Sequence, residues 1–141
     1  MANAWYPFGK AEVARGNIDL LADDIRVIFI DTGDETYNAA DQDIADIAAG
    51  AMVGAGGGNA GSDGVALASK TISDTAVFDA ADTTITSVTG DEFEACLIYK
   101  WTGTAGTSTL IMWIDTGTGM TQTPDGGNVN ITWNGSGIGQ L

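Results

Sequence analysis

Histidine is absent from this 141-residue chain, and cysteine occurs once, at Cys96. Without histidine, a protein lacks the usual general base near neutral pH, the common activator of a serine or cysteine nucleophile, and the commonest zinc and copper ligand. Cys96 lies in an apolar run, where a thiol usually acts as a small core residue, and a single cysteine allows no intrachain disulfide. We therefore expect a protein without enzymatic activity or cofactor, made in a reducing cytoplasm.

Basic residues are scarce, with 5 Lys and Arg against 19 Asp and Glu, and the formal net charge is -14. Binding to nucleic acid or to anionic lipid requires clustered basic side chains that replace counterions, so we expect neither as a partner. The sequence also lacks a basic segment followed by an apolar one at its start, and no apolar run approaches the ~20 residues of a membrane helix. We expect a soluble protein that is not exported by a signal peptide.

The many carboxylates raise the question of acid-base catalysis or of a metal site. Pairs such as Asp79 with Asp82, and Asp91 with Glu92, fall at strand ends and turns, where acidic residues commonly cap and solubilise. We therefore predict no catalytic residue and no dedicated metal site. Calcium stays an open alternative at two places, Asp31 with Asp34 and the group Asp41, Asp43 and Asp46, although neither matches an EF-hand loop.

Two apolar runs, 95–99 and 110–114, are joined by a turn region of Gly, Thr and Ser, and they predict an antiparallel hairpin. Both faces of each run are largely apolar, so neither face is suited to water. One side of the hairpin can be the core of the protein, while the other side is covered by a second sheet or by another subunit. We favour assembly as the reading of this pattern.

The remaining pattern predicts further strands and little helix. We expect a helix over 9–15 that Gly16 ends, a buried strand within 23–34, and an amphipathic helix from Asn38 to about Gly50. Further strands are expected at 65–72, 76–78, 83–88 and 129–133. The fold class is mainly β, a single domain over 1–141 that forms a two-layer β-sandwich or flattened barrel of about seven or eight short strands with one or two short helices.

Three features are candidates for contacts with other molecules. Residues 1–15 form an N-terminal arm and short helix whose aromatic side chains either pack on their own domain or reach a neighbouring subunit; the candidate assembly interface is Trp5, Tyr6 and Phe8. The Gly-rich stretch 54–64 lacks the Lys-Ser/Thr ending of a phosphate loop, and we expect a mobile loop that orders on docking. Trp101, next to a turn, is the candidate glycan contact.

The order of motifs is itself informative. Asp-Asp-Ile-Arg-Val-Ile-Phe-Ile-Asp-Thr is followed by Asp-Gln-Asp-Ile-Ala-Asp-Ile and a Gly-rich stretch, then by Val-Phe-Asp-Ala-Ala-Asp-Thr-Thr-Ile-Thr-Ser-Val-Thr-Gly-Asp, and then by Leu-Ile-Tyr-Lys-Trp-Thr-Gly-Thr and Leu-Ile-Met-Trp-Ile-Asp-Thr-Gly-Thr-Gly. From Gly16 to Trp133 this order resembles a family of small structural proteins encoded near the head genes of tailed bacteriophages. The aromatic cluster at the N-terminus departs from that family's pattern.

The resemblance implies a virion component, a decoration or cement protein on the outer capsid, and it supplies no active-site residues. We expect a symmetric homo-oligomer, a trimer, that binds the major capsid protein and stabilises the shell. Two alternatives are a receptor- or glycan-binding module of a tail fibre, with Trp101 in its platform, and an adaptor of the neck or tail.

Overall fold

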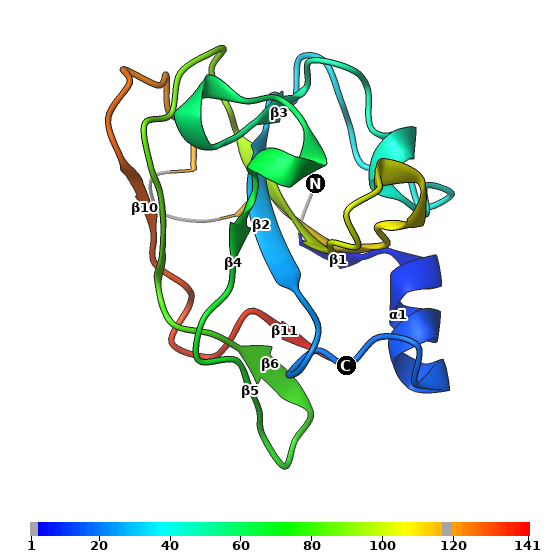
Figure 1. Ribbon diagram of the computed structural model, residues 1–141. Helices are drawn as coiled ribbons and strands as arrows, with labels where there is room; N and C mark the ends of the chain where they lie inside the picture. The colour runs from blue at the N-terminus through cyan, green and yellow to red at the C-terminus, as the bar shows by residue number, and fades with distance from the viewer. Residues whose placement is uncertain (1–2, 117–119) are drawn as a thin grey trace.

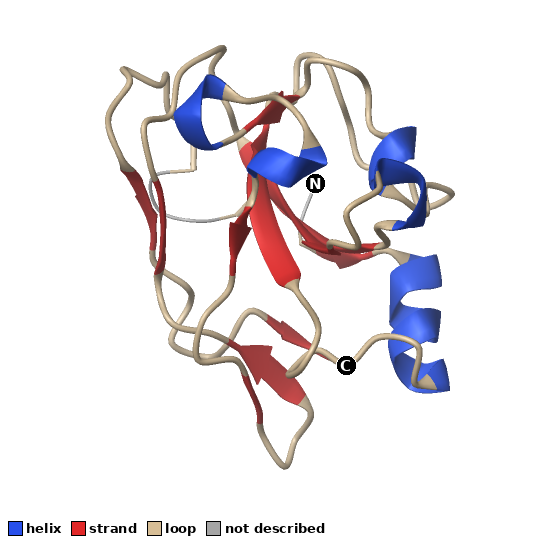
Figure 2. Ribbon diagram, viewed as in Figure 1, coloured by secondary structure: helices blue, strands red, loops and turns tan. Residues whose placement is uncertain are grey.

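The computed structural model describes residues 3–116 and 120–141, and β-strands dominate it (Figures 1 and 2). The largest sheet has the strand order β1-β9-β8-β2-β3, and β4 also pairs with β2. Two small sheets, β10-β7 and β11-β6-β5, complete the β structure. The strands are β1 (Ala4–Trp5), β2 (Ile25–Ile30), β3 (Met52–Val53), β4 (Val65–Ala66), β5 (Thr71–Ile72), β6 (Val77–Asp79), β7 (Thr83–Ile85), β8 (Ala95–Lys100), β9 (Leu110–Ile114), β10 (Val129–Ile131) and β11 (Gly139–Gln140).

The central hairpin that the sequence predicts is confirmed. β8 and β9 pair antiparallel, with Leu97 opposite Trp113, and a register shift between Ile98 and Tyr99 marks an irregularity in the ladder. β2 pairs antiparallel with the other edge of β8 along its whole length. These three strands are rich in β-branched and aromatic residues, which suit a pleated surface that is buried on both sides.

Both faces of the large sheet are covered by other parts of the same chain. On one face, the two small sheets contribute apolar side chains such as Phe78, Ile85 and Ile138 to a core with β2, β8 and β9. On the other face, Tyr6 and the segment from Tyr37 to Met52 cover β8 and β9. The hairpin therefore needs no second subunit to bury its apolar faces, and oligomerisation has to be argued from other features.

The mainly β, sandwich-like fold class is thus confirmed, but its strands are shorter and more numerous than expected. The predicted strand at 65–72 is divided into β4 and β5, and two-residue pairings at β1, β3 and β11 add strands that no periodicity can show. One α-helix, α1 (Pro7–Arg15), agrees with the prediction at the N-terminus, and Gly16 ends it in a left-handed conformation at φ 82°. None of the helices within the described residues has the length and apolar character needed to cross a membrane.

The predicted helix from Asn38 to about Gly50 is wrong. Only one 3₁₀ turn, η1 (Ile44–Asp46), forms there. The backbone instead binds the start of β9: the N–H of Ile44 donates to Ser108 O, and the N–H of Leu110 donates to Gln42 O. These long-range bonds use groups that an α-helix would need for itself, so tertiary pairing overrides the helical spacing of the alanines and isoleucines.

The Gly-rich stretch 54–64 is folded against the domain, and its expected mobility stays a prediction. β3 and β4 pair with the same strand, β2, so the Gly-rich stretch leaves and rejoins a single strand edge. It contains two 3₁₀ turns, η2 (Ala55–Gly57) and η3 (Gly61–Asp63), and its backbone receives hydrogen bonds from Tyr99 and Arg26. A fourth 3₁₀ turn, η4 (Ala105–Thr107), lies between β8 and β9. The glycines allow the stretch to pack closely against its own domain.

Candidate functional site

The N-terminal aromatic side chains differ in their exposure. Tyr6 is 0% exposed, its N–H donates to Ile111 O, and its ring lies 5.1 Å from that of Tyr37. Trp5 lies in β1 and Phe8 in α1, and both are half-buried. Of the two alternatives for the N-terminal aromatic side chains, the structure shows packing on their own domain. Tyr6 is therefore not available to a partner. A role of Trp5 and Phe8 in assembly stays a prediction.

Trp101 is half-buried and held on several sides. The Tyr99 ring meets it edge-on at 6.4 Å, and the Arg26 guanidinium lies 5.7 Å from its ring centroid. A β-carbon at Gly61 would press against the same ring. Contact of Trp101 with a glycan stays a prediction, but these neighbours already occupy part of its surface.

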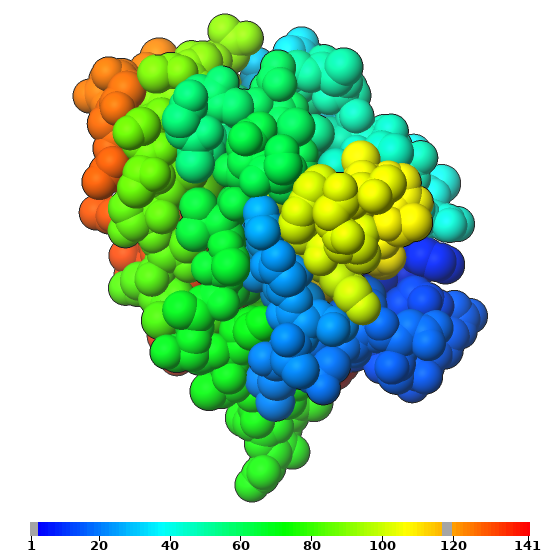
Figure 3. All heavy atoms as spheres, in the orientation of Figure 1, coloured from blue at the N-terminus to red at the C-terminus, as the bar shows by residue number. Residues whose placement is uncertain are grey.

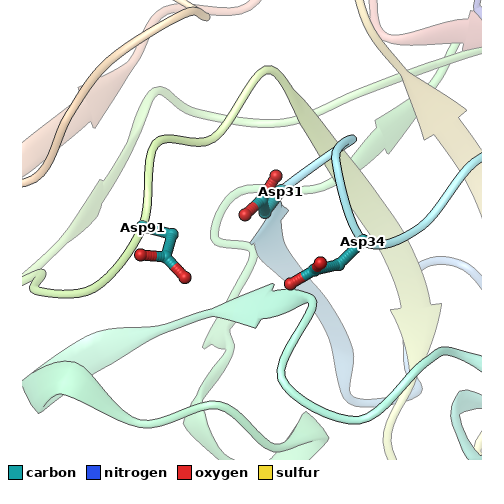
Figure 4. A group of neighbouring side chains, drawn as sticks. All are labelled: Asp31, Asp34 and Asp91. Atoms are coloured by element: carbon teal, nitrogen blue, oxygen red, sulfur yellow. The ribbon is translucent and has the colours of Figure 1, made fainter.

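One group of carboxylates comes together in space. Oxygens of Asp31, Asp34 and Asp91 lie within 4.8 Å of one another, although Asp91 comes from a distant part of the sequence (Figure 4). Asp31 also accepts a 2.7 Å hydrogen bond from the Gly33 N–H, which shapes its own turn. Asp34 and Asp91 are exposed, and Ca²⁺ requires six to eight oxygen ligands, so three carboxylates alone do not define a calcium site.

The other acidic group has a structural use. Asp46 accepts hydrogen bonds from the backbone N–H groups of Gln42 and Asp43 at 2.8 and 3.1 Å, and these bonds lower the pKa of Asp46. Asp41 binds the Asn38 amide at 2.7 Å. Among the described residues, these carboxylates cap turns and do not converge on one point.

Two buried polar groups, the Cys96 thiol and the Tyr6 hydroxyl, resist ionisation. Burial raises the pKa of the Cys96 thiol to about 12, so the nucleophilic thiolate is scarce at neutral pH. The Tyr6 hydroxyl is buried without a hydrogen-bond partner among the described residues, and burial raises its pKa above the ordinary value. Both groups have the properties of core residues.

A cavity of about 350 Å³ lies beside β10, the strand at the left margin of Figure 1. Its floor is apolar and includes Phe29, Ile114 and Ile138, which come from the large sheet and from the segment before β11. Trp133 is half-buried at this cavity, where its indole N–H donates to Ala81 O at 3.1 Å. All of the described residues that line the cavity are uncharged, although the chain has a net charge of -14.

Three buried core side chains retain a small exposed fraction at this cavity. Val129, Ile131 and Ile138 are 8%, 7% and 7% exposed, more than any other residue buried in the core beneath the small sheets. All three line the cavity. Apolar surface left open in a concave, uncharged setting is typical of a binding site.

The polar side chains at the cavity offer donors. Asn3 Oδ1 accepts hydrogen bonds from the N–H groups of Asp115 and Thr116, and Asn134 Oδ1 accepts one from Ser136 N–H. Because the oxygen of each amide is used within the domain, its NH₂ group is left for a ligand, and it donates no bond to another described residue. Such a rim suits a ligand that presents hydrogen-bond acceptors.

The sequence predicted part of this arrangement. The alternation of Val129, Ile131 and Trp133 with polar residues predicted a half-buried strand at 129–133. The alternating burial is confirmed, but the strand is shorter, Val129–Ile131, and ends before Trp133. The cavity itself was missed, because the opposite wall is supplied by Phe29 and Ile114 from distant strands. The asparagines that flank the apolar residues of β10 were the local feature of the sequence that could have pointed to a binding site there.

No protein-family model matches this chain, and a search of curated proteins found no match.

Proposed function

We propose that this chain is a non-enzymatic structural protein of a tailed-bacteriophage virion, a decoration protein that binds the major capsid protein on the outer shell. The order of strand and turn motifs supports the family, because it resembles that of small virion proteins over most of the chain. The observation that carries binding over catalysis is the uncharged cavity beside β10, which exposes core side chains of a strongly acidic protein.

A second surface favours attachment to another protein. The hairpin of β5 and β6 projects from the body at the lower end of Figure 3, and Ile72 on β5 is 38% exposed. Leu141, 36% exposed, follows β11 on the other side of β6 and donates its N–H to Ala76 O. These apolar side chains give each copy a modest contact, and symmetry on a shell multiplies modest contacts into firm attachment.

The test starts from virions purified from the phage whose genome carries this gene. Quantitative mass spectrometry of separated heads and tails is expected to place the chain in the head fraction, in a copy number that matches a repeated position on the shell. Purified chain added to heads that lack it is expected to cosediment with them. Absence from the particle would refute a virion role, and recovery with tails alone would favour the neck or tail adaptor.

The oligomeric state is a separate part of the proposal. Light scattering over a dilution series is expected to show a mass that corresponds to three chains at every concentration, as a trimer requires. A mass of one chain throughout would contradict the trimer. Attachment would then depend on single copies ordered by the shell.

The second candidate function is glycan recognition by a tail-fibre module. Trp133 at the cavity, with the amides of Asn3 and Asn134 beside it, combines an aromatic ring with hydrogen-bond donors. A glycan array is the test, with Trp133→Ala and Trp101→Ala as the variants that distinguish the two tryptophans. No signal on the array would exclude this candidate.

A further inference from the structure

The position of the cavity relative to β10 is informative. Six consecutive residues, 129–134, line it. β10 ends at Ile131, so residues 129–131 line the cavity from the strand and residues 132–134 line it from the segment that follows. The cavity therefore runs beside β10 and its continuation.

One edge of β10 has no strand partner within residues 3–116 and 120–141. β10 pairs antiparallel with β7 on one side, with Asn130 opposite Thr84, and no other described strand pairs with it. An open edge presents backbone N–H and C=O groups that are satisfied by water or by an added strand. Beside this edge lie the core side chains of Val129, Ile131 and Ile138, which are 7–8% exposed and line the cavity.

We propose that the open edge of β10 accepts an extended, uncharged peptide segment of a partner protein as an additional strand. Apolar side chains at alternate positions of that segment fill the cavity. Its backbone carbonyl groups accept hydrogen bonds from the strand edge and from the amides of Asn3 and Asn134. The inference rests on the proposed function only in expecting another virion protein to supply the segment.

The composition of the cavity favours a peptide over a sugar. Its floor is mainly aliphatic, with Ile114, Ile131 and Ile138, and aliphatic side chains of a strand are complementary to such a floor. The face of Phe29 is covered by Phe93, whose ring stacks on it at 3.9 Å, so Phe29 offers no platform to a sugar ring. An uncharged segment is expected because the lining holds no counter-charge, and a charged side chain buried there would lose its hydration without an ion-pair partner.

The experiment uses the full chain and a displayed library of random peptides about twelve residues long, enough to span a strand. Selection is expected to enrich uncharged sequences with apolar residues at alternate positions. The most enriched peptide is then synthesised and titrated into ¹⁵N-labelled protein. Amide resonances of 129–134 and of Ile114 are expected to shift, and the resonances of β10 amides are expected to gain protection from solvent exchange.

The matched variants place one lysine at two different sites. Thr132 is exposed directly after β10, and Thr132→Lys puts a charged side chain at the edge, the device by which natural edges prevent pairing. Ala39→Lys adds the same charge at an exposed site in the segment that covers the other face of the sheet. We expect Thr132→Lys to weaken peptide binding about tenfold or more, and Ala39→Lys to leave it unchanged, with both variants folded by circular dichroism.

Several results would overturn the proposal. The selection could enrich no peptide, or the enriched peptide could bind Thr132→Lys as tightly as it binds the wild type. The amide shifts could be confined to other surfaces. A neutral oligosaccharide such as maltoheptaose could show saturable binding at the cavity in place of peptide. Should circular dichroism show Thr132→Lys to be unfolded, the location of the amide shifts in the wild-type chain decides the matter. Presence on virions without peptide binding refutes this inference alone, whereas peptide binding without presence on virions refutes the proposed function alone.

Discussion

The hydroxyl of Tyr99, at the end of β8, donates a 2.6 Å hydrogen bond to the carbonyl oxygen of Gly61. Tyr99 is 0% exposed, so the bond is buried and links the large sheet to the Gly-rich stretch. A buried hydroxyl needs a partner, and here the partner is the backbone of the Gly-rich stretch, which also accepts a bond from Arg26 at Ser62 O. This bond is one reason why the Gly-rich stretch is folded.

Tyr99→Phe is expected to lower the free energy of unfolding by about 1–2 kcal/mol, because the Gly61 carbonyl loses its buried donor. Urea unfolding measures the loss. Tyr37→Phe is the control, since the Tyr37 hydroxyl donates to Trp5 O in a less buried setting and its loss is expected to cost less. An equal or larger loss for Tyr37→Phe would contradict the importance given to the Tyr99 bond.

Gly64→Ala is expected to destabilise the protein by about 1–3 kcal/mol, because a β-carbon there would overlap the Tyr99 hydroxyl and approach Val27 O. Gly106→Ala is the matched control, since a β-carbon at Gly106 meets nothing within 4 Å. The two thermal unfolding midpoints are compared. Equal midpoints would show that the Gly-rich stretch moves away at little cost and would restore the expectation of a mobile loop.

Tyr6→Ala is expected to cost about 3 kcal/mol or more in unfolding free energy, because it empties a fully buried aromatic site. Phe8→Ala, at a half-buried position, is expected to cost less. Removal of residues 1–9 is expected to unfold the domain, which circular dichroism would show. A folded truncated protein would contradict the assignment of β1 and Tyr6 to the core and would return the segment to the role of an arm.

Stability is expected to fall above about pH 9. Burial raises the pKa of Cys96 from 9.0 to about 12, and it raises the pKa values of Tyr6 and Tyr99 above their ordinary value of 10.0. Above these ordinary values the unfolded chain releases protons that the folded chain retains, so the free energy of unfolding decreases as pH rises. The contribution of these protonated buried groups to the free energy of unfolding is fully present below about pH 9.

Urea midpoints at a series of pH values test this alkaline loss. In Cys96→Ala the decrease above pH 9 is expected to be shallower, because one of the groups with a raised pKa is gone. Midpoints that stay constant from neutral pH to about pH 10.5, where free phenol groups are largely ionised, would refute the prediction.

Asp34→Asn is expected to raise the unfolding free energy by about 0.3 kcal/mol at low ionic strength, because it relieves repulsion from Asp31 and Asp91, and to have no effect in high salt. Asp74→Asn removes an equal charge from the exposed β5–β6 turn as the control. Thermal midpoints with and without sodium chloride measure the difference. The contrary outcome is that calcium chloride stabilises the wild type more than sodium chloride of equal ionic strength does, and that Asp34→Asn abolishes this difference. That outcome would contradict simple repulsion and show that the cluster holds a cation.

Local sequence determined the strands that are buried on both faces and the helix whose two ends are marked by proline and glycine. The apolar runs of β2, β8 and β9 are short and include β-branched and aromatic residues, which favours strands buried on both faces. Pro7 at the first turn and Gly16 at the end mark α1 within the chain itself. The absence of histidine and the excess of acidic side chains likewise limit function without reference to the fold.

Tertiary structure alone decided the fate of the segments that are ambiguous by themselves. The spacing of apolar residues from Ala40 to Ala51 is compatible with a helix, but pairing of this segment with the start of β9 satisfies its backbone groups better. The Gly-rich stretch has little apolar surface of its own, and Tyr99 supplies the contact that holds it. The cavity beside β10 has walls from residues far apart in the chain, and such proximity is a property of the folded chain that no local pattern encodes.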